Sequence, residues 1–240
     1  METYEALYPW RGGLRTVSWI GGKGRANKTV PQGGEYLLKR EVWPSPLDEI
    51  QGRDPDVLYS KTMQEAFDNI IEKHSKFHEI ALFSLCTSTR PYSKSRKWSA
   101  YIKEFESTCD LIIHSNGGIV PIEFEGQFPY LNYDAHGESK FDKIYIEVGI
   151  ERFKKFLCRH PYKFIIFNFR HNMRNVKIAE VVGPWAIKNG ICQEFVILPN
   201  KEQYEQARAE GFASAGYKMY PELWPSILDR IKTQIGKWRI

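Results

Sequence analysis

The pattern of apolar and polar positions predicts that strands and helices alternate from residue 78 to residue 212. Four short apolar runs, at residues 80–85, 111–114, 164–169 and 195–198, are typical of buried strands. Helical patterns occupy residues 98–105, 146–157, 201–211 and 221–238, and residues 175–188 predict a helix interrupted at Gly183-Pro184. This alternation predicts a three-layer α/β/α sandwich with a mainly parallel central sheet, in which the four runs are neighbouring strands.

The first 60 residues differ from the rest because they are rich in Gly, Pro, Trp and Tyr. We expect them to form an irregular N-terminal extension, residues 1–60, packed on an α/β core domain of residues 61–240. Strand-like pieces occur at 16–20 and 36–43, and the Pro-rich stretch 43–55 is typical of a linker. A helix is expected to begin near Ser60, with Thr62 and Glu65 as a capping box and His74 on its apolar stripe.

Composition narrows the class of protein. The chain has 240 residues, 42% hydrophobic and 14% aromatic, which is typical of a folded globular protein. The net charge of +5 permits an anionic partner without requiring one. The four Cys residues form no C-x-x-C pair, so no metal or cofactor is predicted. No apolar run approaches the ~20 residues of a membrane span, and no signal peptide is recognisable, so a cytoplasmic protein with reduced thiols is expected.

The loop after the first buried strand carries the strongest chemical signal. Residues 86–96 are crowded with side chains that can donate hydrogen bonds, among them Cys86, Thr87, Ser88, Thr89, Arg90, Tyr92, Ser93, Ser95 and Arg96. In open α/β sheets, ligands bind at the carboxyl ends of the strands. The loop is therefore the first candidate for a binding or catalytic site.

Two blocks of sequence resemble one known family. Cys86, Pro91, Tyr92 and Ser95 stand at positions of the Pro-Cys-x3-Lys-Pro-Tyr-x2-Ser-x2-His motif of archaeosine synthases, whereas Leu85, Arg90 and Trp98 replace its Pro, Lys and His. A second block, from Gly118 through Pro121, Glu125, Pro129 and Tyr133 to Asp134, is similar to the Gly-hydrophobic-Val-Pro…Glu…Pro…Tyr-Asp segment of that family. The resemblance covers about residues 78–170. It implies a fold similar to the uracil-DNA-glycosylase sandwich.

The resemblance implies that an amine is joined to a modified base. Archaeosine synthases add the amine of free lysine to the nitrile of 7-cyano-7-deazaguanine in tRNA. A site of this kind must accept an exposed base, hold a carboxylate with Arg and protonate the nitrile nitrogen. The first hypothesis is therefore a transferase that joins a free amino acid or amine to a modified base in nucleic acid, either tRNA or DNA. Viral amino-acid:DNA transferases that elaborate thymine are a conceivable relative. The alternatives are a non-catalytic module that binds modified nucleic acid and a DNA base glycosylase.

The candidate residues each have a second, purely structural interpretation. The catalytic candidates are Cys86, Arg90, Tyr92, Ser95, Glu125 and Asp134, and the substrate-binding candidates are Thr87, Ser88, Arg96, Asn116, Pro121, Tyr133, Arg170 and His171. Cys86 is either a nucleophile, a wall of the pocket or a small core residue. Tyr92 either stacks on a base or packs its ring in the protein. Glu125 either contacts the base or the incoming amine, or is a surface carboxylate. If residues 119–124 are extended, Glu123 lies on the same face as Glu125.

A separate set of cations is available for phosphate contacts: Lys23, Arg25, Lys28, Lys94 and Lys97. The first three lie in a Gly-rich stretch, residues 21–28, that lacks the spacing of a P-loop. They either contact the nucleic-acid backbone or form a solvated hairpin tip.

Overall fold

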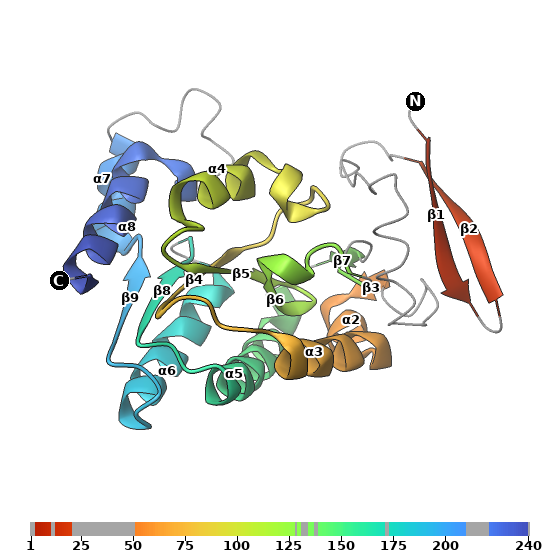
Figure 1. Ribbon diagram of the computed structural model, residues 1–240, viewed down its shortest axis with the longest axis horizontal. Coiled ribbons are helices and arrows are strands. Elements are labelled where there is room, and N and C mark those ends of the chain that lie inside the picture. Colours follow the sequence, from red (N-terminus) through yellow and green to blue (C-terminus); the bar gives the residue numbers. More distant parts are fainter. Residues whose placement is uncertain are drawn as a thin grey trace. The chain divides into compact units, whose positions relative to one another are not determined.

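The computed structural model describes residues 3–10, 13–20, 51–127, 129–130, 134–136, 139–170, 173–209 and 221–239 (Figure 1). The chain divides into two compact units. Unit 1 comprises residues 1–74, 86–99 and 113–145, and unit 2 comprises residues 75–85, 100–112 and 146–240. Each unit takes segments from several parts of the chain. The boundary expected near residue 60 stays a prediction.

The structure is a mixed α/β fold. The strands are β1 (Thr3–Trp10), β2 (Gly13–Ile20), β3 (Gln51–Arg53), β4 (Ile80–Leu85), β5 (Asp110–Ser115), β6 (Gly118–Pro121), β7 (Asp134–His136), β8 (Phe164–Asn168) and β9 (Glu194–Leu198). The helices are α2 (Asp54–Tyr59), α3 (Lys61–Lys73), α4 (Arg96–Phe105), α5 (Asp142–Arg159), α6 (Arg174–Lys188), α7 (Lys201–Ala209) and α8 (Pro225–Trp238). Short 3₁₀ helices are Tyr92–Lys94, Ile122–Phe124, Ser139–Phe141 and Pro221–Leu223.

Five strands form the main sheet in the order β6-β5-β4-β8-β9. β4 and β9 each pair with β8 in parallel. The two-residue connection between β5 and β6 can join only antiparallel strands, and Gly118 supplies the positive φ of 124° that this turn needs. The prediction that the four apolar runs are neighbouring strands is confirmed. The Pro121 segment also lies at the sheet edge, as expected from the missing N–H of Pro.

The strand order reverses direction at β4. The chain moves outward from β4 through β5 to β6, and it later returns beside β4 as β8 and continues to β9 (Figure 1). The gap between the carboxyl ends of β4 and β8 is therefore a topological switch point, the place where open α/β sheets bind ligands. Ser84 and Asn168 are paired residues at this point.

Within unit 2, helices cover both faces of the β4–β8–β9 part of the sheet. On one face, Phe83 and Phe167 stack with ring centroids 5.5 Å apart, and Phe153 of α5 packs against both rings. On the other face, Tyr101 of α4 accepts a hydrogen bond from Asn168 of β8. Burial of these large rings supplies most of the favourable free energy of folding in this region.

Two helices differ in detail from the expectation. The N-cap of α3 is Ser60, whose Oγ accepts a hydrogen bond from Met63 N at 3.2 Å, so the Thr62–Glu65 capping box is wrong. Helix α6 is continuous through Pro184 instead of interrupted. The reason lies in packing, since α6 buries one face on the sheet. A Cβ on Gly183 would meet the Phe195 ring at 2.4 Å, so this glycine allows close approach and does not mark a break.

The N-terminal part contains more regular structure than the expected irregular extension. Strands β1 and β2 form an antiparallel hairpin, and β3 pairs in parallel with β7. Residues 21–50, which include the second strand-like piece, lie outside the described residues. Among the described helices, none is both long enough and apolar enough to cross a membrane.

Candidate functional site

The loop that follows β4 begins beside the end of β5. Cys86 N donates a hydrogen bond to His114 O at 3.0 Å, and the Cys86 side chain is half-buried. The strand ends here because the residues that follow are polar and include Pro91, which cannot donate to a ladder. The Arg90–Pro91 peptide bond is cis. Cys86 is thus held at a strand end in unit 1, as the sequence predicted.

Arg90 has a different role from the one expected for an anion-binding residue. Its side chain is 4% exposed, and its Nη1 donates to the carbonyl oxygens of Thr87 and Thr89. Its guanidinium carbon lies 4.2 Å from the centroid of the Tyr92 ring. Arg90 therefore braces the loop from inside by charge-assisted hydrogen bonds and by stacking.

Tyr92 and Ser95 are also buried. Tyr92 is fully buried beneath Arg90, so in this conformation its ring does not offer a surface for a base. Ser95 Oγ accepts from Trp98 N at 3.2 Å, which is the geometry of an N-cap for α4. Trp98 stands where the family motif has His, and it is fully buried as a core residue. Arg90, Tyr92 and Ser95 therefore each have a structural role in the loop. Their presence does not require that each of them contacts a substrate.

Glu125 joins the second sequence block to the first. Its Oε2 accepts a hydrogen bond from Ser93 N at 2.7 Å, and the side chain is half-buried. Both residues belong to unit 1. The two blocks that carry the family resemblance are therefore in direct contact through their own motif segments.

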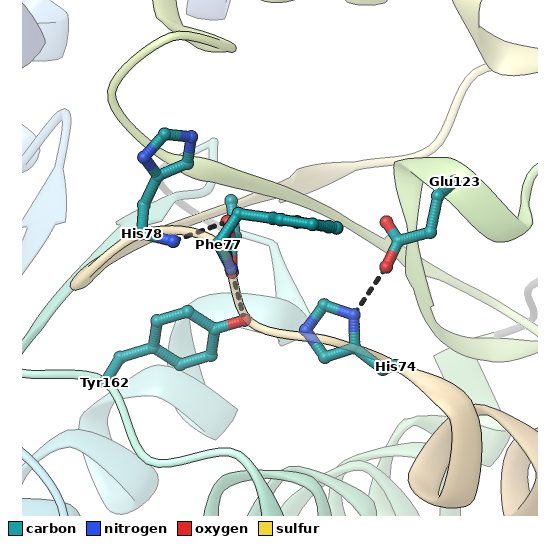
Figure 2. A network of polar contacts seen from close by, with 6 residues as sticks. His74, Phe77, His78, Glu123 and Tyr162 are labelled. Carbon is teal, nitrogen blue, oxygen red and sulfur yellow. Dashed lines mark hydrogen bonds and ion pairs between the residues drawn. The ribbon is translucent and has the colours of Figure 1, made fainter.

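Glu123 points elsewhere, because residues 122–124 form a 3₁₀ helix and are not extended. The expectation that Glu123 and Glu125 share a face is therefore wrong. Figure 2 shows the Glu123 carboxylate directed at the imidazole of His74, with Oε1 2.5 Å from Nδ1. The His74 side chain is 1% exposed and that of Glu123 is 38% exposed, so solvent reaches only the carboxylate of the pair.

A further titratable residue near the carboxyl end of β5 was not among the residues predicted from the sequence. His114, the penultimate residue of β5, is buried, and its Nε2 lies 3.4 Å from Tyr145 Oη. The two rings stack with centroids 5.7 Å apart. The available signal was a titratable residue near the carboxyl end of a buried strand, the feature that had singled out Cys86.

The predicted phosphate cations separate by exposure. Lys94 and Arg96 are exposed, whereas Lys97 is 1% exposed and does not offer a surface contact, so this part of the prediction is corrected.

The predicted substrate-binding residues differ in burial. Thr87 and Pro121 are buried, Asn116 is half-buried and Ser88 is exposed. Five predicted residues lie outside the described residues: Lys23, Arg25, Lys28, Tyr133 and His171. Asp134 is described only as the first residue of β7.

A second polar group lies in unit 2, at the carboxyl ends of β4 and β8. Ser84 Oγ donates to Asn168 O at 3.0 Å, and Tyr101 Oη donates to Glu222 O at 3.2 Å. Asn168 Nδ2 donates to Tyr101 Oη, and among the described residues Asn168 Oδ1 accepts no hydrogen bond although it is buried. Burial raises the pKa of Tyr101 well above 10, and the Glu222 carboxylate raises it further. A buried amide oxygen at a switch point can accept a hydrogen bond from an N–H group of a ligand.

Arg170 belongs to the same group. Its Nε lies 3.8 Å from Glu222 Oε1, and the Glu222 side chain is 2% exposed while that of Arg170 is 34% exposed. A buried carboxylate thus anchors a partly exposed guanidinium near the strand ends. Glu222 fixes the orientation of the Arg170 side chain, and the exposed part of the guanidinium can bind an anion.

A family model described as a domain of unknown function, DUF5591, matches residues 60–186. The chain belongs to the DUF5591 family. The DUF5591 match begins at the N-cap of α3 and ends in α6, so it includes the loop 86–95, the turn at Glu125 and Asn168.

One solved structure is similar to this DUF5591 protein. It is the crystal structure of AF0587, a protein of unknown function, at 18% sequence identity and a TM-score of 0.48. The similarity covers 70% of this chain and 48% of that chain, so the chain spans about half the length of AF0587. No curated protein matches the sequence.

Proposed function

We propose that this protein is a transferase that joins an amine, such as that of a free amino acid, to a modified base in nucleic acid. The supporting observation is the hydrogen bond from Ser93 N to Glu125 Oε2, because it unites the two sequence blocks that resemble archaeosine synthases. Ser93 lies between the motif positions Tyr92 and Ser95, so its contact with Glu125 brings the two matched segments together. The proposal includes a fold related to uracil-DNA glycosylases.

The proposed chemistry balances without a cofactor. The amine nitrogen forms a bond to the nitrile carbon of a 7-cyano-7-deazaguanine-type base and loses a proton, while the nitrile nitrogen gains one. The product is an amidine, and no group leaves. Glu125 is the proposed acceptor for the amine proton, since it is a half-buried carboxylate at the motif loop. Cys86 lines the same loop as a nucleophile or as a wall.

The polar group of unit 2 is a separate candidate for ligand binding, considered by itself. A base presents N–H donors on its Watson–Crick edge, and Asn168 Oδ1 is a buried acceptor that lies at the switch point. Arg170, held by Glu222, is suited to the carboxylate of an amino acid. In this candidate, Asn168 recognises the base and Arg170 recognises the amino acid.

A non-catalytic module that binds modified nucleic acid is the second candidate. The observation in its favour is that Arg90 and Tyr92 are occupied with each other inside the loop and that Trp98 replaces a possible base. A base glycosylase is the third candidate, supported by the proposed fold relationship alone.

One experiment distinguishes the three candidates. Nucleosides from cells that express the protein, and nucleic acid incubated with purified protein and amino acids, are analysed by mass spectrometry. Added mass on a base supports the transferase, a released base supports the glycosylase, and a mobility shift without either supports the binding module. Glu125→Gln is expected to abolish the added mass, whereas Glu65→Gln, an exposed residue on α3, leaves it unchanged. Cys86→Ala is compared with Cys158→Ala, which alters an exposed thiol of α5.

A further inference from the structure

A small cavity in unit 2 has no part in the site described above. Its volume is about 260 Å³, and it lies at the amino ends of β4 and β8, next to the end of α8. Its lining includes two aromatic residues, Phe164 and Trp238, and the charged or titratable residues His78, Glu79, Lys163 and Arg239. A cavity of this size is near the lower limit for a small-molecule site.

The aromatic wall is fixed in position. The rings of Phe164 and Trp238 stack with centroids 4.8 Å apart and planes inclined by 8°. Trp238 Nε1 donates a hydrogen bond to Glu194 Oε2 at 2.8 Å, which sets the orientation of the indole. Both residues are half-buried and line the cavity. Because each ring covers one face of the other, a ligand can stack only on an outer face of the pair.

Another lining residue, His78, is also held by hydrogen bonds. Asp110 is buried, and its carboxylate accepts hydrogen bonds from His78 N at 3.1 Å, from Phe77 N at 3.1 Å and from Tyr162 Oη at 2.9 Å (Figure 2). The His78 ring donates from Nε2 to Glu106 O at 2.9 Å, because a carbonyl oxygen can only accept. The cavity is therefore preorganised at the aromatic pair and at His78.

The charge of the lining is positive. Lys163 and Arg239 are exposed cations on this cavity. The one lining carboxylate, Glu79, is compensated by Lys76, whose Nζ lies 3.0 Å from its Oε1. Lys163 Nζ lies 5.3 Å from the centroid of the Phe164 ring, so this ammonium is held next to the aromatic pair. Lys163 and Arg239 together leave the lining with a positive charge.

We propose that this cavity binds one nucleotide unit, with the base against the Trp238–Phe164 pair and the phosphate at Lys163 and Arg239. Flat aromatic side chains next to cations are the combination with which proteins bind single-stranded nucleic acid, because every base has a face that stacks. The volume is suited to one base and its phosphate and not to a longer segment. Binding here involves none of residues 86–95, so it is independent of the proposed transferase activity.

The test is a titration of the full chain, followed by the indole N–H signal of Trp238 in two-dimensional NMR. Trp238→Phe identifies that signal among those of the seven Trp residues. The ligands are a nucleoside monophosphate, a short oligothymidylate and inorganic phosphate, all at one ionic strength. Lys163→Ala/Arg239→Ala removes the two cations, and Lys201→Ala/Lys237→Ala is the matched control, since it removes two exposed lysines outside the lining.

The nucleotide is expected to shift the Trp238 signal, and the cavity variant is expected to weaken this binding at least about tenfold while the control variant does not. If the oligonucleotide binds at least about tenfold tighter than the monophosphate, the ligand is a strand, and equal affinities assign the cavity to a free nucleotide. An unshifted Trp238 signal, equal binding by the two variants, or equal affinity for inorganic phosphate would overturn the proposal. Each of these outcomes leaves the test of the transferase, which depends on Glu125 and Cys86, unaffected.

Discussion

Ser93 donates its main-chain N–H to Glu125 Oε2 over 2.7 Å. The two residues are 32 positions apart, in a loop after β4 and in a turn after β6. A carboxylate that accepts from a main-chain N–H in a half-buried place forms one of the stronger kinds of hydrogen bond. This contact fixes the conformation of the loop from outside, as Arg90 does from inside.

Glu125→Ala is expected to loosen the loop. Hydrogen bonds to charged groups contribute about 1.5–3 kcal/mol, so exchange of the Ser93 amide hydrogen should become about tenfold faster or more. Hydrogen–deuterium exchange resolved at residues 91–95 measures this. Glu123→Ala is the control, because its carboxylate contacts His74 and not Ser93. Equal protection of Ser93 in both variants would show that Glu125 does not hold the loop.

The four thiols are expected to react in two classes. Burial raises the pKa of Cys109 and of Cys192 to about 11, from an ordinary value of 9.0. Only the thiolate is nucleophilic, so at pH 8 each of these groups is reactive in about one molecule in a thousand, and burial slows it further. Cys158 is exposed and Cys86 is half-buried, so both should react first.

Iodoacetamide labelling followed by peptide mass spectrometry checks this order. Cys86→Ala and Cys158→Ala should each remove one fast thiol and leave the two slow ones. Rapid labelling of Cys109 or Cys192 in the folded protein would contradict the buried positions of those thiols.

Tyr101→Phe is expected to destabilise the protein by about 1–3 kcal/mol, because the hydroxyl joins Asn168 to the carbonyl of Glu222 and both would be left buried without it. Urea unfolding measures this, and Tyr59→Phe, at a residue that is 56% exposed, should change little.

The same tyrosine predicts a pH dependence. The folded-state pKa of Tyr101 is raised, so its stabilising effect is complete below pH 10 and is lost as the pH rises above 10. Stability should therefore fall as the pH rises above about 10, and that of Tyr101→Phe should fall less steeply over the same range. Parallel curves for the two proteins would exclude Tyr101 as the cause.

Two helical glycines should respond oppositely to alanine. In Gly183→Ala the new Cβ would lie 2.4 Å from the Phe195 ring, so α6 must move from β9 at a cost of about 1–3 kcal/mol. In Gly236→Ala nothing lies within 4 Å of the new Cβ, and the protein should gain about 0.5–1 kcal/mol. Thermal unfolding of the pair measures the difference, and a change of the same sign in both would refute the packing explanation for Gly183.

If the substrate is a base in a polymer, Lys23, Arg25 and Lys28 are expected to contact phosphate. Their joint replacement by Ala should weaken binding on every sequence alike, and each lost contact should reduce the slope of log affinity against log salt by about 0.7 for single strands or 0.9 for duplex. Glu125→Gln should instead abolish transfer to the base without changing that slope, because Glu125 is the proposed proton acceptor and does not contact phosphate. Binding that is insensitive to salt would indicate a free small molecule as substrate.

Much of the fold could be predicted because strand and helix periods are local properties. The runs that became β4, β5, β8 and β9 are apolar on both faces, which only a strand covered by helices requires. The predicted interruption of α6 at Gly183-Pro184 was wrong because it used only the local preferences of Gly and Pro. Composition alone favours a helix end at Pro, whereas contact of α6 with Phe195 across the sheet outweighs that preference.

The candidate site was predictable in its location but not in the roles of its residues. Resemblance to a motif identifies residue types, and these types also suit a braced loop. Arg90, Tyr92 and Ser95 turned inward, where they satisfy carbonyls, pack a ring and cap α4. Lys97 is also buried. The sequence does not fix which face of α4 packs against the core, so it does not fix which lysines of this helix are exposed.

The sequence by itself determined the alternation of strands and helices from β4 onward and the loop after β4 as the chemically rich segment. These follow from hydrophobic period and from the fixed chemistry of Pro and Gly, which act within a few residues. Only the tertiary structure decided that Glu125 meets Ser93, that Glu123 turns to His74, and that Asn168 presents a buried acceptor between β4 and β8. Such contacts join residues 32 to 84 positions apart, and no local pattern fixes the direction of a side chain until the backbone segments that carry it have packed.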